Sequence, residues 1–252
     1  MSAQMYHAAT ITVGDHLGSF TLFGMTFNGD TIWETAAAAV ILIGLGLFAR
    51  ARVTAGAPGG VQLFFETIFK WAQDQVETNI GLRVAPFVVP IAATLFMFIL
   101  IANWFSVLPF QFPTNSGGLN DAFAPPASDV NFVFALAWVV LLWAQFAGAR
   151  RRGVGRHFLQ LAKGHFAPAF IINIIEEFAK FLSLPLRLFG NMFGGAIMVT
   201  IIISLFPSYL LWAPNAIWKL FDLFIGAVQA FVFALLTIIY FGQAMEIPED
   251  AH

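Results

Sequence analysis

The sequence predicts an all-α protein that crosses a membrane five times. Hydrophobic residues make up 59% of the chain and charged residues 10%, whereas soluble domains carry about 25% charged residues. Thirty of the 252 residues are Phe and seven are Trp. Five long apolar segments and one amphipathic segment divide the chain. These observations together indicate a polytopic integral membrane protein.

The apolar segments are close to or beyond the length of about 20 residues that a membrane-spanning helix needs. They are predicted at residues 33–50, 85–107, 130–149, 168–206 and 210–247. Residues 59–81 instead mix apolar and charged side chains, which predicts an amphipathic helix on the membrane surface or on a partner. Residues 1–32 form an outer N-terminal segment. We expect one membrane domain, and because no internal repeat is visible, the duplicated transporter folds are disfavoured.

The last two segments are longer than a perpendicular crossing requires. A helix of about 38 residues is about 57 Å long at 1.5 Å per residue, against roughly 30 Å of hydrocarbon. These helices are therefore expected to tilt, to bend or to extend beyond the hydrocarbon. Pro185 is the candidate for a bend in the fourth segment, because proline cannot donate the helical hydrogen bond.

Basic residues mark alternate links between the segments. The links 109–129 and 207–215, like the N-terminal segment, contain no Lys or Arg. The link between the third and fourth segments is rich in them: Arg150, Arg151, Arg152, Arg156 and Lys163. Arg50 and Arg52 follow the first segment in the same way. The positive-inside rule then predicts an outer N-terminus and a cytoplasmic C-terminus.

The fourth segment carries an arginine, Arg187, well inside its apolar run. A guanidinium group stays protonated at any accessible pH, and a charge near the bilayer centre costs roughly 3 kcal/mol on insertion scales. Such a residue is a functional candidate by default. The structural alternative is an ion pair with Asp222, which we favour less because replacing a buried ion pair by apolar residues is often more stable.

Polar positions form one line along each of the last two segments. Residues three or four apart share a face of a helix. In the fourth segment the line consists of Asn173, Glu176, Lys180, Ser183, Arg187 and Asn191, with Glu177 beside it. In the fifth it consists of Lys219, Asp222, Gly226, Gln229, Tyr240 and Gln243. Two such lines on adjacent antiparallel helices predict a hydrated path or an interhelical ion-pair network.

Simpler interpretations remain open for several of these residues. Glu176, Glu177 and Lys180 would also suit the cytoplasmic end of an ordinary helix. Lys219 lies near the outer end of the fifth segment and could extend its amine to the membrane interface. Gly190, Gly194 and Gly195 would suit close helix packing inside the protein. The same glycines would equally suit a smooth surface along which the helices of another subunit pass.

The run Leu186–Met192, LRLFGNM, together with Gln229–Phe233, QAFVF, and Tyr240, resembles subunit a of the F-type ATP synthases in its bacterial form. The resemblance is close over the last two segments and looser over residues 126–131 and at Asn103. It implies that the essential arginine of the family is Arg187. It further implies that the asparagine one turn later is Asn191 and that the glutamine of the last helix is Gln229.

The resemblance implies a stator role in a rotary motor. In the family, two offset aqueous half-channels exchange protons with a carboxylate on a rotating ring of c subunits, and the arginine separates them. A permanent positive charge attracts that carboxylate and cannot relay the proton itself. The implied partners are the c ring, b-type peripheral-stalk subunits, the rest of the F1F0 complex and membrane lipids. The implied location is the bacterial plasma membrane, with H⁺ as the transported ion, no cofactor and no catalysis by this chain alone.

Two departures from the family pattern bear on the proton route. Many members carry a carboxylate or His nine residues after the arginine, where this chain has Ala196. Some carry His seven residues before the glutamine, where this chain has Asp222. We therefore expect Asp222 to act in the outer half-channel, with Asp129 and Asn103 as secondary candidates.

A third departure concerns the cytoplasmic half-channel. The family glutamate fourteen residues before the arginine falls on Asn173 here. Glu176 and Glu177 follow within one turn, so we expect one of them to take over its role.

Other functional classes are less compatible with the sequence. The absence of Cys excludes thiolate metal sites and thiol catalysis, no G-x-x-x-x-G-K-[ST] pattern predicts a nucleotide site, and a net charge of −2 argues against nucleic acid. The main rival is a secondary transporter for a small anion with Arg187 as counter-ion. A membrane redox subunit with haem or quinone ranks last, because haem ligation there usually needs His within the spans and all five His lie outside the predicted spans.

Overall fold

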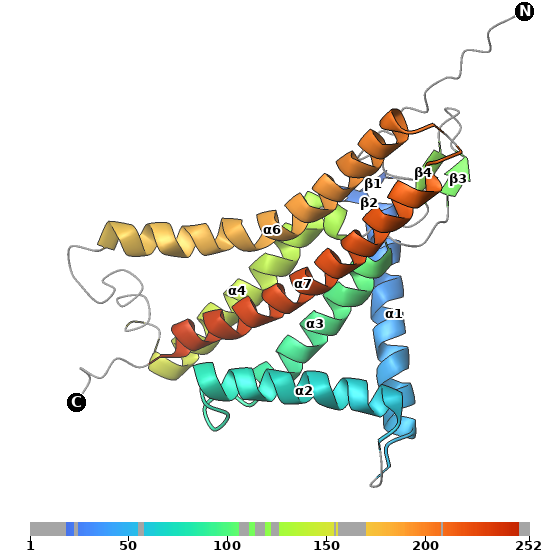
Figure 1. The fold of residues 1–252 in the computed structure, drawn as a ribbon. Helices are drawn as coiled ribbons and strands as arrows, with labels where there is room; N and C mark the ends of the chain where they lie inside the picture. The colour runs from blue at the N-terminus through green and yellow to red at the C-terminus, as the bar shows by residue number, and fades with distance from the viewer. Residues whose placement is uncertain are drawn as a thin grey trace, which may run out of the picture.

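The computed structural model describes residues 19–22, 25–54, 58–105, 111–113, 119–121, 126–153, 155, 170–207 and 209–246. Six long helices form the body of the described chain (Figure 1). In chain order they are α1 (Gly29–Ala51), α2 (Gly60–Asn79), α3 (Val88–Trp104), α4 (Val130–Arg152), α6 (Phe170–Leu205) and α7 (Trp212–Met245). Each coincides with one of the predicted segments.

Within the described ranges, four helices are long and apolar enough to cross a membrane, judged by length and composition. They are α1, α4, α7 and the Phe181–Leu205 part of α6. The fifth predicted span, α3, is apolar but has 17 residues, which gives it a length of about 26 Å. The helices thus support a multi-pass membrane protein, while a fifth full crossing by α3 stays a prediction.

Two short β-hairpins accompany the helices in the described part of this all-helical chain. Strand β1 (Ser19–Leu22) pairs antiparallel with β2 (Met25–Asn28), and β3 (Gln111–Pro113) pairs antiparallel with β4 (Leu119–Asp121). Strands of three or four residues are too short to produce a recognisable alternating pattern. Both hairpins lie at one end of the helical body (Figure 1). We call it the hairpin end. The opposite end, where α4 and α7 terminate, is called the arginine end after Arg150, Arg151 and Arg152 in the last turn of α4.

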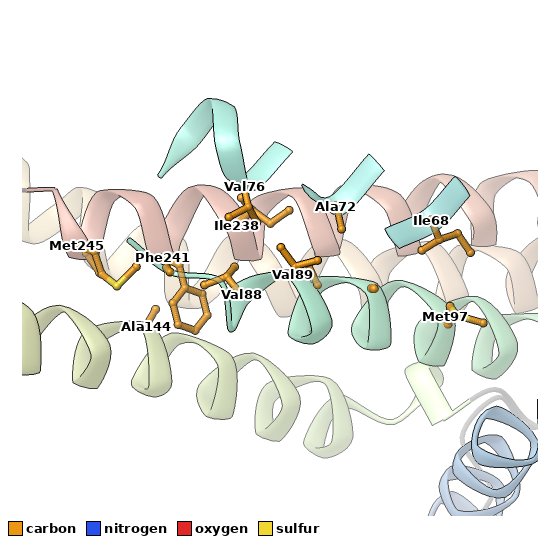
Figure 2. Close-up of a cluster of buried hydrophobic side chains, with 14 residues drawn as sticks. Ile68, Ala72, Val76, Val88, Val89, Met97, Ala144, Ile238, Phe241 and Met245 are labelled. Atoms are coloured by element: carbon orange, nitrogen blue, oxygen red, sulfur yellow. The ribbon is translucent and has the colours of Figure 1, made fainter. Parts of the chain in front are cut away.

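The helices pack around α3 and α7 at the arginine end. Phe241 and Ile238 of α7 are completely buried and belong to one apolar cluster with Val88 of α3, Val76 of α2 and Ala144 of α4 (Figure 2). Burial of a large apolar side chain contributes about 1.5–3 kcal/mol. This cluster fixes the arginine ends of four helices relative to one another.

Helix α2 has the predicted amphipathic character. Ile68, Ala72 and Val76 are buried against the other helices, whereas Lys70 and Asp74 are exposed. It lies across the arginine end and at a steep angle to α1 (Figure 1). A left-handed turn at Gly81, with φ +88°, ends the segment and redirects the chain into α3.

Helix α6 packs on α4 and α7 through a second apolar cluster. Leu184 and Leu188 of α6 are each 1% exposed and lie in this cluster with Val140 of α4 and Phe233 of α7. Figure 1 shows that α6 changes direction along its length, and its first part runs away from α7. Pro185 lies inside this helix, and an internal proline is a common cause of such a bend.

Candidate functional site

Arg187 lies on the open side of α6. Its side chain is exposed, as are Ser183 one turn before it and Gly190 one turn after it, whereas the neighbouring Leu184 and Leu188 are buried. The helix therefore places leucines in the core and directs the arginine away from it. Among the described residues, no ion pair to Arg187 is found, so the predicted structural alternative, a pair with Asp222, is not supported.

The glycines that follow Arg187 divide into two kinds. A Cβ atom built at Gly190 or at Gly194 would meet nothing within 4 Å. A Cβ built at Gly195 would lie 3.3 Å from Oδ1 of Asp222. The first two glycines therefore leave an open surface beyond the arginine, and the third allows a close approach of α7. We call the exposed positions Ser183, Arg187 and Gly190, together with the half-buried Gly194, the Arg187 face.

The contact between Gly195 and Asp222 fixes the level of α7 beside α6. Because the two helices run antiparallel, a step of seven residues from Asp222 to Gln229 corresponds to the step from Gly195 back to Leu188. Gln229, which is half-buried, therefore lies level with Leu188 and within one residue of Arg187. Burial of Leu188 and of Ala230, the residue after Gln229, in one apolar cluster agrees with this register.

Asn103 joins the same level from α3. Its side chain is 2% exposed, and its Nδ2 donates a hydrogen bond of 3.2 Å to the carbonyl oxygen of Gly226. Gly226 lies one turn after Asp222 on α7. A Cβ at Gly226 would come within 3.1 Å of Cβ of Asn103. The structure thus brings Asn103 and Asp222, both predicted for the outer half-channel, to neighbouring levels of the bundle.

The carboxylate of Asp129 is held by hydrogen bonds from α1 and α4. Its Oδ1 accepts a hydrogen bond of 2.8 Å from the amide of Asn131, so it caps the start of α4. Its Oδ2 accepts from Nδ2 of Asn28 at 2.7 Å and from Oγ1 of Thr31 at 3.0 Å. The residue is only 7% exposed. These three donors join the beginnings of α1 and α4, a task that the sequence patterns did not reveal.

The polar line of α6 is exposed at Ser183 and Arg187, and the helix packs against α7 through Leu188 and Gly195 instead. The two helices are close from Gly195 to Leu188, but the first part of α6 runs away from α7 (Figure 1). Tyr240, further along α7, is half-buried and packs against the cluster that contains Phe233. The candidates Asn173, Glu176, Glu177 and Asn191 lie on α6, and their side chains lie outside the described residues.

A buried carboxylate on α1 was not selected from the sequence. Glu34 is 2% exposed, although most of the first predicted span is apolar. Thr31, Glu34 and Ala38 are buried at steps of three and four, so they share the face of α1 that turns toward the bundle. That spacing was available in the sequence, but the apolar residues around it conceal the signal.

Comparison with known proteins identifies the family. A family model described as ATP synthase A chain matches residues 31–242, which include Arg187, Asp222 and Gln229. The chain belongs to the ATP synthase A chain family. Similar relatives are the ATP synthase subunits a of Mycobacterium marinum and of Acidothermus cellulolyticus, at 54% and 43% identity. These alignments cover 97% and 94% of this chain, and 98% and 84% of the relatives.

The family extends to more distant relatives. ATP synthase subunit a of Vibrio alginolyticus is 30% identical, over 94% of this chain and 95% of the relative. Membership of the ATP synthase A chain family and the long apolar helices together make this chain a multi-pass membrane protein of ATP synthesis and proton transport. The anion-transporter alternative is not favoured by these comparisons.

Proposed function

We propose that this chain is the stator subunit through which protons reach and leave the rotating c ring of an F-type ATP synthase. Two offset half-channels would protonate and deprotonate the carboxylate of each c subunit. Arg187 would separate the half-channels and attract the ionised carboxylate as it passes. The chain itself would form and break no covalent bond other than those to the transferred proton.

The observation that carries this proposal is the open environment of Arg187. An arginine in a span costs several kcal/mol unless a counter-charge or water compensates it. Arg187 is exposed on an apolar helix, is followed by the open glycines Gly190 and Gly194, and has no ion pair among the described residues. A carboxylate on a moving partner would supply the missing counter-charge, and the glycines would let that partner pass closely.

The polar residues suggest a division of the proton path between the two ends of the bundle. Toward the hairpin end, Asp222 would relay protons, with Asn103 beside it and Gln229 at the level of Arg187. Toward the arginine end, Glu177 or Glu176 would exchange protons with the cytoplasm. Supporting polar groups on this route would be Asn173, Ser183, Asn191 and Tyr240. Asp129 is better suited to capping α4 than to relaying protons.

The surroundings of the chain follow from the same proposal. The N-terminus would face outward and the C-terminus the cytoplasm of a bacterium, because Arg150, Arg151 and Arg152 crowd the arginine end. The Arg187 face would contact the c ring. Other exposed apolar surfaces, such as that of α1, would contact lipid or b-type peripheral-stalk subunits.

The central test replaces Arg187 in the whole complex and measures ATP-driven proton pumping into membrane vesicles. We expect Arg187→Ala to abolish coupled pumping, and Arg187→Lys to restore little of it, because a lysine is a compact point charge that can lose its proton when buried. Arg83→Ala is the matched control, since Arg83 is exposed outside the spans. Normal coupled pumping by Arg187→Ala would overturn the proposal.

The two relay assignments have a separate test in the same assay. We expect Asp222→Asn and Glu177→Gln each to reduce the rate of pumping, because an amide cannot release and rebind the transported proton. If both variants pump at the rate of the unmodified complex, these two residues are not relays.

A further inference from the structure

Two arginines of α4 hold the end of α7. Nη1 of Arg151 donates a hydrogen bond of 2.9 Å to the carbonyl oxygen of Met245, and Nη2 of Arg152 donates one of 3.0 Å to the carbonyl oxygen of Gln243. Both acceptors belong to the last turn of α7, which ends at Met245. The contacts connect residues 94 and 91 positions apart in the sequence.

The last carbonyl groups of a helix have no partner within the helix and carry its negative dipole end. The sequence of α7 offers no basic residue in its last turn to compensate them. Arg151 and Arg152 compensate two of these carbonyls from a neighbouring helix, with a rigid donor group that always carries its charge. The carboxylate of Glu246, directly after α7, also attracts Arg152 electrostatically. Two side chains of α4 therefore cap the C-terminal end of α7.

The same end of α7 is confined on a second side. A Cβ at Gly242 would come within 3.0 Å of the carbonyl oxygen of Asn79, at the end of α2. The last turn of α7 is therefore held between the end of α2 and the arginines of α4. A helix that slips by one residue moves about 1.5 Å along its axis and turns its side chains by about 100°. Contacts at its end thus determine which residues face α6.

We propose that Arg151 and Arg152 are positioning residues that clamp the end of α7 and so keep Asp222 against Gly195 of α6 and Gln229 at the level of Arg187. This inference rests on the proposed proton path. The three arginines at the end of α4 are equivalent for the positive-inside rule, but they differ in this clamp. Arg150 is exposed, and no hydrogen bond from it to α7 is found among the described residues.

Arg150 therefore provides a matched control. The experiment compares Arg151→Gln/Arg152→Gln, Arg151→Lys/Arg152→Lys and Arg150→Gln in the whole complex, reconstituted in vesicles. The first readout is the number of protons pumped per ATP hydrolysed. The second is amide hydrogen exchange over residues 240–246, measured by mass spectrometry on the complex.

We expect the double Gln variant to speed exchange in the last turn of α7 several-fold, since hydrogen bonds from charged donors are lost, and to lower the pumping ratio at least about twofold. Arg150→Gln should change neither readout. The double Lys variant should recover part of both, because lysine keeps the charge and a donor. If the double Gln complex does not assemble, the single variant Arg151→Gln replaces it with the same expectations.

Three outcomes would overturn the clamp. Exchange that is unchanged in the Gln variants shows that the arginines do not hold the helix end. Faster exchange with an unchanged pumping ratio shows a cap without a positioning role. An equal loss in Arg150→Gln shows an effect of net charge alone. Exchange does not depend on proton transport, so a failed clamp is distinguishable from a failed proton path, which Arg187→Ala tests by itself.

Discussion

The carboxylate of Asp222 on α7 lies against the backbone of Gly195 on α6, close enough that a Cβ on the glycine would stand 3.3 Å from Oδ1. Gly195 is eight residues beyond Arg187, or about 12 Å along the helix axis. The carboxylate is thus held at a distance along α6 from the arginine. This separation is what a relay on one side of a charged barrier requires.

The first prediction concerns that contact. Gly195→Ala should reduce ATP-driven proton pumping several-fold, because its methyl group would lie closer to Oδ1 than most Cβ contacts and would displace the carboxylate by a few tenths of an ångström. The measurement is the initial rate of acidification of vesicles that contain equal amounts of complex. Gly44→Ala on α1, where a Cβ meets nothing within 4 Å, is the control. Equal rates for both variants would show that the contact has no role in transport.

The second prediction concerns the open part of the Arg187 face. Gly190→Leu should leave the fold of this chain intact, because a Cβ atom at this exposed position meets nothing within 4 Å in the described part of the chain. It should nevertheless lower the rate of proton pumping at least about tenfold if the c ring passes this surface. Amounts of the chain in the membrane and pumping rates are measured together, with Gly44→Leu as the control. A Gly190→Leu complex that pumps normally would place the c ring elsewhere.

The third prediction concerns the approach of α3 to α7. Gly226→Ala would bring a methyl group within 3.1 Å of Cβ of Asn103, and overpacking of this kind costs about 1–3 kcal/mol. We expect a lower midpoint of thermal unfolding for the purified complex. Gly60→Ala, at an open position at the start of α2, should leave the midpoint unchanged. A midpoint that does not move in Gly226→Ala would mean that α3 yields easily at this level.

The fourth prediction separates capping from proton relay at Asp129. Asp129→Ala removes the acceptor of three hydrogen bonds and should destabilise the chain by about 2–4 kcal/mol, combining the loss of a cap with that of two further bonds. Asp129→Asn can still cap α4 but cannot relay a proton. It should therefore retain most of the pumping rate. Loss of pumping in a stable Asp129→Asn complex would restore Asp129 as a relay.

The length of the apolar segments, with the amphipathic composition of residues 59–81, was sufficient to predict every long helix within a few residues. The predicted span 130–149 corresponds to α4, Val130–Arg152, and 210–247 to α7, Trp212–Met245. A membrane-spanning helix needs about 20 consecutive, mostly apolar residues, so its position follows from local composition. The hairpins left no such signal, because their strands have three or four residues.

The residues of the candidate site could be selected from the sequence, but their arrangement in space could not. Arg187, Asp222 and Gln229 stand out because polar groups are rare within apolar spans. Their helical spacing predicted two facing polar lines, whereas Arg187 is exposed and α6 and α7 are close over only part of their length. Spacing describes one straight helix at a time, and the direction of a bend depends on the packing around it.

The sequence by itself determined that this chain is a membrane protein, where its helices lie and that Arg187 lies within an apolar segment, since each of these follows from local composition. Only the tertiary structure decided that Asp222 rests on Gly195, that Asp129 caps α4, and that Arg151 and Arg152 hold the end of α7. These contacts join residues far apart in the chain. Their existence depends on how helices are rotated and shifted against one another, which packing of whole surfaces sets.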